Sequence, residues 1–519
     1  MIFRAPEPDL AIPEVPLTPL LLERAEGRGE MPALVDGTSG RTLTYRGWAA
    51  AVRQAAVGLD RRGFRKGDVL AIYSYNVPEY AVAFHAVSLL GGAVTSINPL
   101  YTPAELAHQL DDAKARLLVT APPFMASAQQ AGHEVGLEEI FVFGECQGAT
   151  PFASLLDATG EPPAVSIDPS HDTVALPYSS GTTGLPKGVM LTHHNLVANL
   201  LQSETTIGVR EGDVVLGVLP FFHIYGMVVI MNLALHVGAT VVTMPRFDLE
   251  GCLQILQRHR VTFAYVVPPI VLALAKSPLV EKYDLSSVRA LFSGAAPLGE
   301  ELSRAAGARL GCTVAQGYGM TETSPVTHIS RMREDGTRGP GIGPPVPNTE
   351  VKVLDVATGA ELGPDQEGEI CVRGPQVMKG YLNRPEATAA MIDADGWLHT
   401  GDVGYADANG CFFIVDRVKE LIKYKGMQVA PAELEAVLLS HPAVADAAVV
   451  PREDEEAGQV PKAFVVMKGD ASPEALMAYV AERVAPYKRL RFLEVTDAIP
   501  KSPSGKILRR VLVAKDRGA

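Results

Sequence analysis

Cysteine and tryptophan are scarce in this sequence. Its 519 residues include five Cys and two Trp. The cysteines are odd in number and far apart, so they form neither a CxxC metal-binding motif nor an evident disulfide framework. They are Cys146, Cys252, Cys312, Cys371 and Cys411. This usage is typical of a reducing compartment, and we expect a cytoplasmic location.

Net positive charge is also missing. The 46 Lys and Arg residues stand against 59 Asp and Glu residues, which gives a formal charge of −13. A general nucleic-acid binder needs a basic face, so the composition argues against that class. With 47% hydrophobic and 20% charged residues, the balance is that of a globular protein. The length predicts two or more folding units.

The sequence shows no obvious targeting signal or membrane span. Its N-terminal stretch (MIFRAPEPDLAIPEVPLTPL) carries acids and prolines where a signal peptide needs an unbroken apolar run. The C-terminal AKDRGA is neither a peroxisomal nor an ER address. Residues 214–245 are uncharged, but Pro220, Gly226 and Gly238 interrupt them. We therefore predict strand, loop, helix and strand in a buried core here, and no transmembrane segment.

Apolar runs alternate with helix-like segments before Gly339. Examples of such runs are residues 68–74, 115–121 and 261–268. This alternation indicates βαβ units and parallel sheets, and hence an α/β fold. Beyond Gly339, short strand-like runs broken by Gly and Pro predict antiparallel β structure or a small β-barrel.

The sequence predicts a large N-terminal domain and a smaller C-terminal one. We place the N-terminal domain at residues 1–416, a hinge at 417–419 and an α+β C-terminal domain at 420–519. About a hundred residues are enough to fold as an independent unit. No internal repeat or low-complexity segment interrupts this division.

Residues 178–189 (YSSGTTGLPKGV) have the composition of a phosphate-binding loop. The glycines free the backbone to curl, hydroxyls and amides can face a polyphosphate, and Lys187 adds positive charge. A Walker A loop that begins at Gly181 needs glycine at position 186, where Pro186 stands, so a P-loop NTPase is excluded. The hydroxyls, small backbone positions and positive charge of this segment come from Ser179, Ser180, Gly181, Thr182, Thr183, Gly184 and Lys187.

This loop resembles the phosphate loop of the adenylate-forming superfamily of acyl-CoA synthetases, adenylation domains and beetle luciferases. Further matching motifs are PFFHIYG (220–226), SGAAPLG (293–299), QGYGMTE (316–322), GEICVRGPQVMKGY (368–381), GWLHTGD (396–402), VDRVKELIKYKGMQVAPAELE (415–435) and PKSPSGKILRR (500–510). In the family the stretch matching residues 316–322 is preceded by a glycine (GQGYGMTE), and here Ala315 stands at that position. The motifs HIYG, SGAAPLG and KELIKYKGMQVAP are most similar to those of 4-coumarate:CoA ligase and its bacterial relatives.

The resemblance implies a ligase reaction in two steps. A carboxylate attacks the α-phosphate of ATP and gives an acyl-adenylate and pyrophosphate. The CoA thiol then displaces AMP. Both steps develop negative charge that amides, a cation and Mg²⁺ disperse. The expected partners are therefore ATP, CoA and a small carboxylic acid, with Mg²⁺ as the expected metal.

The resemblance also assigns the nucleotide contacts. Glu322 is expected to approach Mg²⁺, and Thr321 the α-phosphate. Asp402 is expected to accept the ribose hydroxyls because a carboxylate can take two O–H bonds at once. Arg417 is expected on the ribose side, and Tyr318 is the expected adenine-stacking aromatic. The glycines on either side of that tyrosine, Gly317 and Gly319, are expected to let a ligand approach the backbone.

The resemblance also assigns residues to the pocket that binds the acyl group. An isolated His near aromatic residues is usually a core residue whose ring nitrogens have hydrogen-bond partners. By resemblance, His223 instead lies at the carboxylate entrance. The residues expected to line the pocket or its wall are Tyr225, Gly226, Ser293, Ala295, Ala296, Pro325 and Val326.

The C-terminal segment supplies two further sets of catalytic residues by resemblance. Lys506 corresponds to the adenylation lysine, which bridges the substrate carboxylate and the α-phosphate. Lys423 and Gln428 correspond to residues of the thioester-forming arrangement, and the turn Lys425-Gly426 is expected to face the pantetheine. Lys419 is expected to be the hinge about which the C-terminal domain rotates.

Several functions remain open at this point. The motifs favour an aromatic acid as substrate, above all 4-coumarate or another hydroxycinnamate. A medium- or long-chain fatty acyl-CoA synthetase, a luciferase-like oxygenase and a carrier-loading adenylation domain are the enzyme alternatives, and a degenerate nucleotide-binding protein is the non-enzyme one. The oligomeric state stays open between monomer and homodimer.

Overall fold

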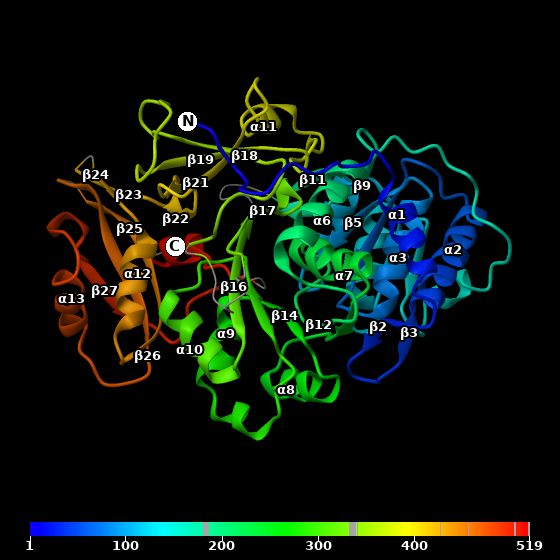
Figure 1. Cartoon of the computed structure of the whole chain (residues 1–519), viewed down its shortest axis with the longest axis horizontal. Coiled ribbons are helices and arrows are strands. Elements are labelled where there is room, and N and C mark those ends of the chain that lie inside the picture. Colours follow the sequence, from blue (N-terminus) through cyan, green and yellow to red (C-terminus); the bar gives the residue numbers. More distant parts are fainter. Residues whose placement is uncertain are drawn as a thin grey trace.

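The computed structural model describes residues 1–179, 186–331, 339, 341–425, 427–454, 456–502 and 505–516. Their strands form four sheets. Figure 1 shows the N-terminal elements (blue) at one end of the molecule and the C-terminal elements (orange and red) at the other. Five candidate site residues of the phosphate loop, from Ser180 to Gly184, lie outside the described residues, as does Gly426.

The first sheet has nine strands in the order β10-β11-β9-β5-β4-β6-β7-β8, with β20 pairing β11. The bounds are β4 (Val69–Tyr73), β5 (Ala93–Ile97), β6 (Ala115–Thr120), β7 (Glu139–Val142), β8 (Thr150–Pro151), β9 (Thr173–Ala175), β10 (Tyr178–Ser179), β11 (Lys187–Thr192) and β20 (Gly380–Tyr381). Strand β4 runs parallel to β5 and β6 and is buried at every position, as expected for a strand covered on both faces. The predicted strands at 68–74 and 115–121 are thus confirmed.

The second sheet has eight strands in the order β17-β16-β15-β14-β12-β13-β2-β3. The bounds are β2 (Pro32–Asp36), β3 (Thr42–Thr44), β12 (Val214–Gly217), β13 (Thr240–Thr243), β14 (Phe263–Val266), β15 (Ala290–Ser293), β16 (Thr313–Gly319) and β17 (Val326–Ile329). Strands β12 to β16 pair in parallel, and the antiparallel β17 closes one edge. The carboxyl ends of β15 and β16 carry the motifs SGAAPLG and QGYGMTE.

Helices cover both sheets of the N-terminal part. They are α1 (Leu17–Glu26), α2 (Tyr45–Arg61), α3 (Pro78–Leu89), α4 (Pro103–Asp112), α5 (Met125–Val135), α6 (His193–Ile207), α7 (Leu233–Val237), α8 (Leu249–Arg258), α9 (Pro268–Lys276) and α10 (Glu300–Leu310). Helix α6 follows strand β11 at the end of the phosphate loop and begins with a reciprocal capping box between Thr192 and Asn195. This cap satisfies the first free amides of the helix and sets where it starts.

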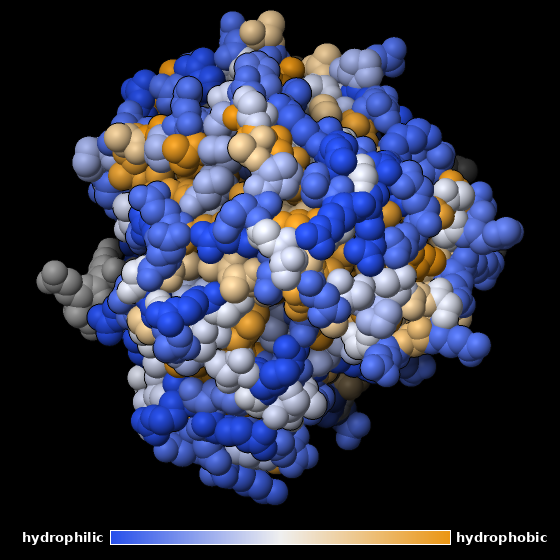
Figure 2. Space-filling view, turned by 90° about the vertical axis from the view of Figure 1, so that its right-hand side faces the viewer, coloured by the Kyte–Doolittle hydropathy of each residue, from blue (hydrophilic) through white to orange (hydrophobic). Residues whose placement is uncertain are grey.

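The uncharged stretch at residues 214–245 forms β12, the π-helical segment η3 (Tyr225–Asn232), α7 and β13, in the predicted order of strand, helix and strand. Its apolar residues belong to the main hydrophobic core. No helix in the described ranges is long and apolar enough to cross a membrane. The face of the molecule in Figure 2 is mostly hydrophilic, with hydrophobic side chains in scattered groups.

The third sheet is antiparallel, in the order β1-β18-β19-β21-β22. Its strands are β1 (Phe3–Arg4), β18 (Glu350–Leu354), β19 (Gly368–Arg373), β21 (Leu398–Ala406) and β22 (Phe412–Arg417), and α11 (Pro385–Ala389) lies between β20 and β21 in the chain. Antiparallel β structure was one of the two predictions for this segment and is confirmed. The strands pair in a single row with β1 and β22 at its ends.

The fourth sheet contains β24-β23-β26-β25, with β27 pairing β26. Its strands are β23 (Ile422–Tyr424), β24 (Met427–Val429), β25 (Val444–Asp454), β26 (Gly458–Met467) and β27 (Phe492–Val495), and its helices are α12 (Pro431–Ser440), α13 (Pro473–Ala481) and α14 (Arg509–Asp516). These elements enclose a hydrophobic cluster of their own. The chain passes from the third sheet to the fourth between Arg417 and Ile422.

Candidate active site

A cluster of polar groups around the buried Asp402 links β16 to the third sheet. The Tyr318 hydroxyl donates to Asp402 Oδ2 at 2.6 Å. Arg417 Nε lies 2.9 Å from the other carboxylate oxygen, Asp402 Oδ1. Asp402 and Arg417 are register partners on β21 and β22, so the pairing of these strands brings them together. Burial raises the pKa of Asp402 above its ordinary value, while Arg417 and the Tyr318 hydrogen bond act in the opposite direction.

Lys506 reaches this cluster from the C-terminal segment. Burial lowers the pKa of Lys506, and the positive charge of Arg417 lowers it further, whereas Glu420 and Asp402 raise it. A Cβ at the neighbouring Gly505 would lie 3.4 Å from Pro269 in α9, so this segment packs against the N-terminal part of the molecule. The structure therefore brings four predicted site residues together: Tyr318, Asp402, Arg417 and Lys506.

A second polar group surrounds Glu322, which is 5% exposed. Glu322 Oε1 accepts hydrogen bonds from the Ser179 hydroxyl and the Tyr381 hydroxyl, each at 2.8 Å. Lys187 Nζ lies 4.9 Å from the centre of the Tyr381 ring. Both described ends of the phosphate loop, β10 and β11, thus lie beside the predicted metal ligand.

Tyr381 was missed as a site residue by sequence reasoning. It ends the quoted motif GEICVRGPQVMKGY, which was the available signal. Strand β20 pairs with β11, with Tyr381 opposite Val189, and this long-range pairing brings the tyrosine to the phosphate loop.

The glycines on both sides of Tyr318 are required by the packing of the protein itself. A Cβ at Gly317 would lie 2.6 Å from the Phe292 ring, and one at Gly319 would lie 1.9 Å from the Pro325 carbonyl oxygen. Sequence reasoning expected these glycines to make room for a ligand. The structure adds a second reason, since no larger residue fits at either position without a shift of its neighbours. Thr321 and Glu322 follow in the short 3-10 segment η5 (Thr321–Thr323).

The expected acyl-pocket residues gather near the carboxyl ends of β15 and β16. Tyr225 is 7% exposed, and its hydroxyl donates to the Phe292 carbonyl at 2.9 Å. A Cβ at Gly226 would lie 2.1 Å from the Pro220 carbonyl oxygen, so the first turn of η3 needs glycine here. The Ser293 hydroxyl is buried without a hydrogen-bond partner among the described residues, which makes it available to a ligand.

His223 is neutral near pH 7 because burial lowers its pKa to about 4. Its Nδ1 accepts the Tyr225 amide at 3.3 Å. A neutral imidazole has one acceptor and one donor nitrogen, so the proton of His223 resides on Nε2. The residue therefore offers a neutral N–H donor.

The remaining wall residues differ in exposure. Ala295 is exposed and has a left-handed backbone (φ +68°), whereas Ala296 is partly exposed. Pro325 and Val326 are buried. Asn199 holds the backbone of Val326 on both sides: its amide nitrogen donates to the Val326 carbonyl at 2.8 Å, and its oxygen accepts the Val326 amide at 3.1 Å. Sequence reasoning did not single out Asn199.

The second set of residues predicted to be catalytic lies elsewhere in this conformation. Lys423 is exposed on β23, where it pairs in register with Gln428 on β24, and Lys425 lies in the connecting turn with φ +47°. Among the described contacts, no hydrogen bond or ion pair joins Lys423 to the cluster of Asp402, Arg417 and Lys506. Lys419 is exposed in the segment that connects the third and fourth sheets.

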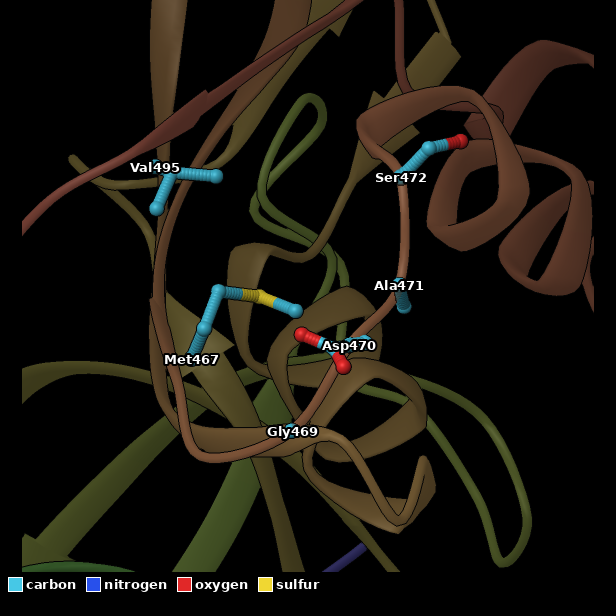
Figure 3. A pocket seen from close by; sticks show the side chains of 6 residues that line it. All are labelled: Met467, Gly469, Asp470, Ala471, Ser472 and Val495. Atoms are coloured by element: carbon cyan, nitrogen blue, oxygen red, sulfur yellow. The ribbon is translucent and has the colours of Figure 1, made fainter.

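An open depression on the C-terminal part is separate from these groups. It is lined by Met467, Gly469, Asp470, Ala471, Ser472 and Val495, as Figure 3 shows. None of the site residues predicted from the sequence lines it. We assign it no role in the chemistry.

Comparisons with known proteins identify the family. Residues 21–382 match the family described as AMP-binding enzyme, and residues 433–506 match the AMP-binding enzyme C-terminal domain. The first match alone spans more than half of the chain. The chain belongs to the AMP-binding enzyme family, which confirms the resemblance seen in the motifs.

Individual relatives cover nearly the whole chain. A 4-coumarate–CoA ligase 5 from Oryza sativa subsp. japonica is 47% identical over 99% of this chain and 97% of the relative. A 4-coumarate–CoA ligase 1 from Solanum tuberosum is 45% identical over 99% and 96%. These relatives agree with the similarity to 4-coumarate:CoA ligases that the motifs indicated.

Solved structures share the α/β architecture. The anthranilate CoA ligase AuaEII in complex with anthranoyl-AMP superposes with a TM-score of 0.89 at 28% identity, covering 98% of both chains. The o-succinylbenzoate CoA synthetase from Bacillus subtilis in complex with its acyl-adenylate intermediate gives a TM-score of 0.82 at 33% identity, covering 96% of this chain and 98% of that one. The predicted fold class is therefore confirmed.

Proposed function

We propose that this protein is an ATP-dependent acid:CoA ligase that acts on 4-coumarate or a related hydroxycinnamate. The observation that carries the reaction class is that the C-terminal segment brings Lys506 to Asp402 and Arg417 on the paired strands β21 and β22. The identity of 45–47% to 4-coumarate–CoA ligases over nearly the full length supports the choice of acid. The scattered cysteines support a cytoplasmic location.

The phosphate end of ATP is proposed to bind between the phosphate loop and Glu322. The Glu322 carboxylate and the Ser179 hydroxyl lie 2.8 Å apart and offer oxygen ligands, which Mg²⁺ prefers. Lys187 adds a positive charge beside them. These residues fit a magnesium–triphosphate group. When bound, Mg²⁺ neutralises phosphate charge and helps the pyrophosphate to leave.

The ribose is proposed to bind at Asp402. Each of its carboxylate oxygens has one described partner, Tyr318 or Arg417. A carboxylate oxygen can accept a second hydrogen bond, so both remain able to accept ribose hydroxyls. Arg417 keeps this buried carboxylate charged and in place. Tyr318 lends its ring to the adenine side while its hydroxyl stays bonded to Asp402.

The acid is proposed to react between His223 and Lys506. The neutral Nε2–H of His223 can donate to a carboxylate oxygen and orient it, and Tyr225 places its ring on the pocket side. Lys506 carries a positive charge that can bridge the carboxylate and the α-phosphate. This charge lies where negative charge develops during attack, so it lowers the barrier to adenylation.

Thioester formation is proposed to use a second orientation of residues 420–519 against residues 1–416. In the described orientation Lys423 is exposed on β23, whereas Lys506 lies by Asp402 and Arg417. Rotation about residues 417–419, with Lys419 as pivot, would replace Lys506 by the face that bears Lys423 and Gln428. The turn Lys425-Gly426 would then border the path of the CoA thiol.

Pyrophosphate release across a panel of acids tests the proposal. With ATP, Mg²⁺ and CoA present, kcat/KM for 4-coumarate should exceed that for benzoate and for octanoate. A preference for octanoate or longer acids would refute the hydroxycinnamate assignment and favour the fatty acyl alternative. If the enzyme releases pyrophosphate but forms no acyl-CoA thioester when CoA is present, a carrier-loading or oxygenase activity would be favoured instead.

A further inference from the structure

A second cluster of chemically reactive side chains lies on the third sheet, outside the proposed active site. Glu369 and Cys371 are two residues apart on β19, so their side chains share one face of the sheet. His399 on β21 is the register partner of Cys371. Strand pairing therefore places a carboxylate, a thiol and an imidazole side by side.

The three donor atoms are close enough to share one ion. His399 Nδ1 lies 2.9 Å from Glu369 Oε2 and 3.5 Å from Cys371 Sγ, and all three donor atoms lie within 4.8 Å of one another. In a tetrahedral zinc site, bonds of about 2.0–2.3 Å place neighbouring ligand atoms roughly 3.3–3.7 Å apart. Small side-chain rotations would bring these atoms to such spacings.

A hydrogen bond orients Glu369, and a carboxylate faces the far side of His399. The remaining oxygen of Glu369, Oε1, accepts the Gly401 amide at 3.1 Å. Asp393 Oδ2 lies 3.8 Å from His399 Nε2, the ring nitrogen that faces away from the cluster. A metal-bound histidine usually donates its other N–H to a carboxylate or carbonyl, and a small approach of Asp393 to Nε2 would let it take this role.

We propose that Glu369, Cys371 and His399 form a binding site for a divalent cation of the zinc class, with water as the fourth ligand. The donor set of one sulfur, one nitrogen and one oxygen favours zinc over magnesium or calcium, which prefer oxygen alone. The side chains of Glu369 and His399 are 21% and 31% exposed, so an ion and a water molecule can enter from solvent.

Binding must displace one proton. Burial above all, with the negative charges of Glu369 and Asp393, raises the pKa of the Cys371 thiol to about 12, against the opposing effect of Lys352 on the neighbouring β18. The thiol proton is therefore released when the sulfur–metal bond forms. In the metal-free protein His399 Nδ1–H donates to Glu369 Oε2 at 2.9 Å. Binding through Nδ1 therefore requires this proton to move to Nε2, toward Asp393, so that the imidazole stays neutral and the thiol proton is the one released to solvent. No redox step is involved.

Cobalt provides a direct test, because Co²⁺ occupies zinc sites and a thiolate–cobalt bond absorbs in the near ultraviolet. The purified full-length protein, free of ATP and Mg²⁺, should bind one equivalent of Co²⁺ with this charge-transfer band, and Zn²⁺ should abolish it. Cys371→Ser should remove the band. Cys146→Ser is the matched control and should keep it, since Cys146 lies in another part of the structure.

Two further variants separate ligation from folding. Glu369→Gln should weaken Co²⁺ binding while circular dichroism stays unchanged. Asp393→Asn should keep the band but weaken binding by about 10–100-fold, as expected for a group that orients a ligand. Absence of the band in the unmodified protein, or an equal band in Cys371→Ser, would overturn the proposal. This outcome leaves the ligase assignment untouched, because pyrophosphate release reports on a separate site.

Discussion

Replacement of Lys506 by alanine should separate the two half-reactions. In the described conformation, Lys506 is the charged group that the C-terminal segment brings to Asp402 and Arg417. Loss of one preorganised electrostatic contact costs about 10²–10³-fold in rate, or about 2.7–4 kcal/mol. We expect a loss of this size in pyrophosphate release. The fold should survive, because Asp402 keeps its bonds to Arg417 and Tyr318.

The assay measures each half-reaction alone. Pyrophosphate release from ATP and 4-coumarate reports adenylation, and thioester formation from supplied 4-coumaroyl-AMP and CoA reports the second step. Lys506→Ala should slow the first and leave the second within about threefold of the unmodified enzyme, well below the loss of one catalytic contact. Lys501→Ala is the matched control: this lysine lies in the same segment but pairs with Asp446 at 2.6 Å. It should leave both steps unchanged.

The result that refutes this reasoning is an equal loss in both half-reactions. A single fixed arrangement of the C-terminal part, in which Lys506 serves both steps, would produce it. Loss of folding would also produce it, but would lower the unfolding temperature and appear in circular dichroism. An effect of Lys501→Ala equal to that of Lys506→Ala would show that the basic segment acts only through its overall charge.

Three further predictions follow from the site. Glu322→Gln should raise the Mg²⁺ concentration needed for half-maximal pyrophosphate release and slow adenylation by about 10²-fold; unchanged activity at limiting Mg²⁺ would exclude its metal role. Lys423→Ala should slow thioester formation from supplied acyl-adenylate yet keep pyrophosphate release, and the reverse pattern would contradict domain rotation. Burial lowers the pKa of His223 to about 4, below the usual 6.5 or so. Between these values the unfolded chain binds more protons, so the free energy of unfolding should fall as pH drops from 6.5 toward 4. In urea titrations His223→Gln should lessen this fall, and an unaltered pH dependence would argue against the buried neutral imidazole.

The sequence by itself determined the fold class and the family. The strand within residues 68–74 was predictable because a parallel strand covered on both faces is apolar at successive positions, a pattern visible within a few residues. The phosphate loop was equally visible, since glycines, hydroxyls and one lysine stand together in a short segment. Local patterns of this kind need no knowledge of distant contacts.

The tertiary structure decided which distant groups meet. Asp402 and Arg417 are ordinary charged residues until the register of β21 and β22 joins them. Tyr381 reaches Glu322 only because β20 pairs with β11. The cysteine spacing excluded a CxxC motif, yet antiparallel pairing sets Cys371 beside His399. Strand register depends on the packing of whole sheets, so these contacts have no signature in the spacing of residues along the chain.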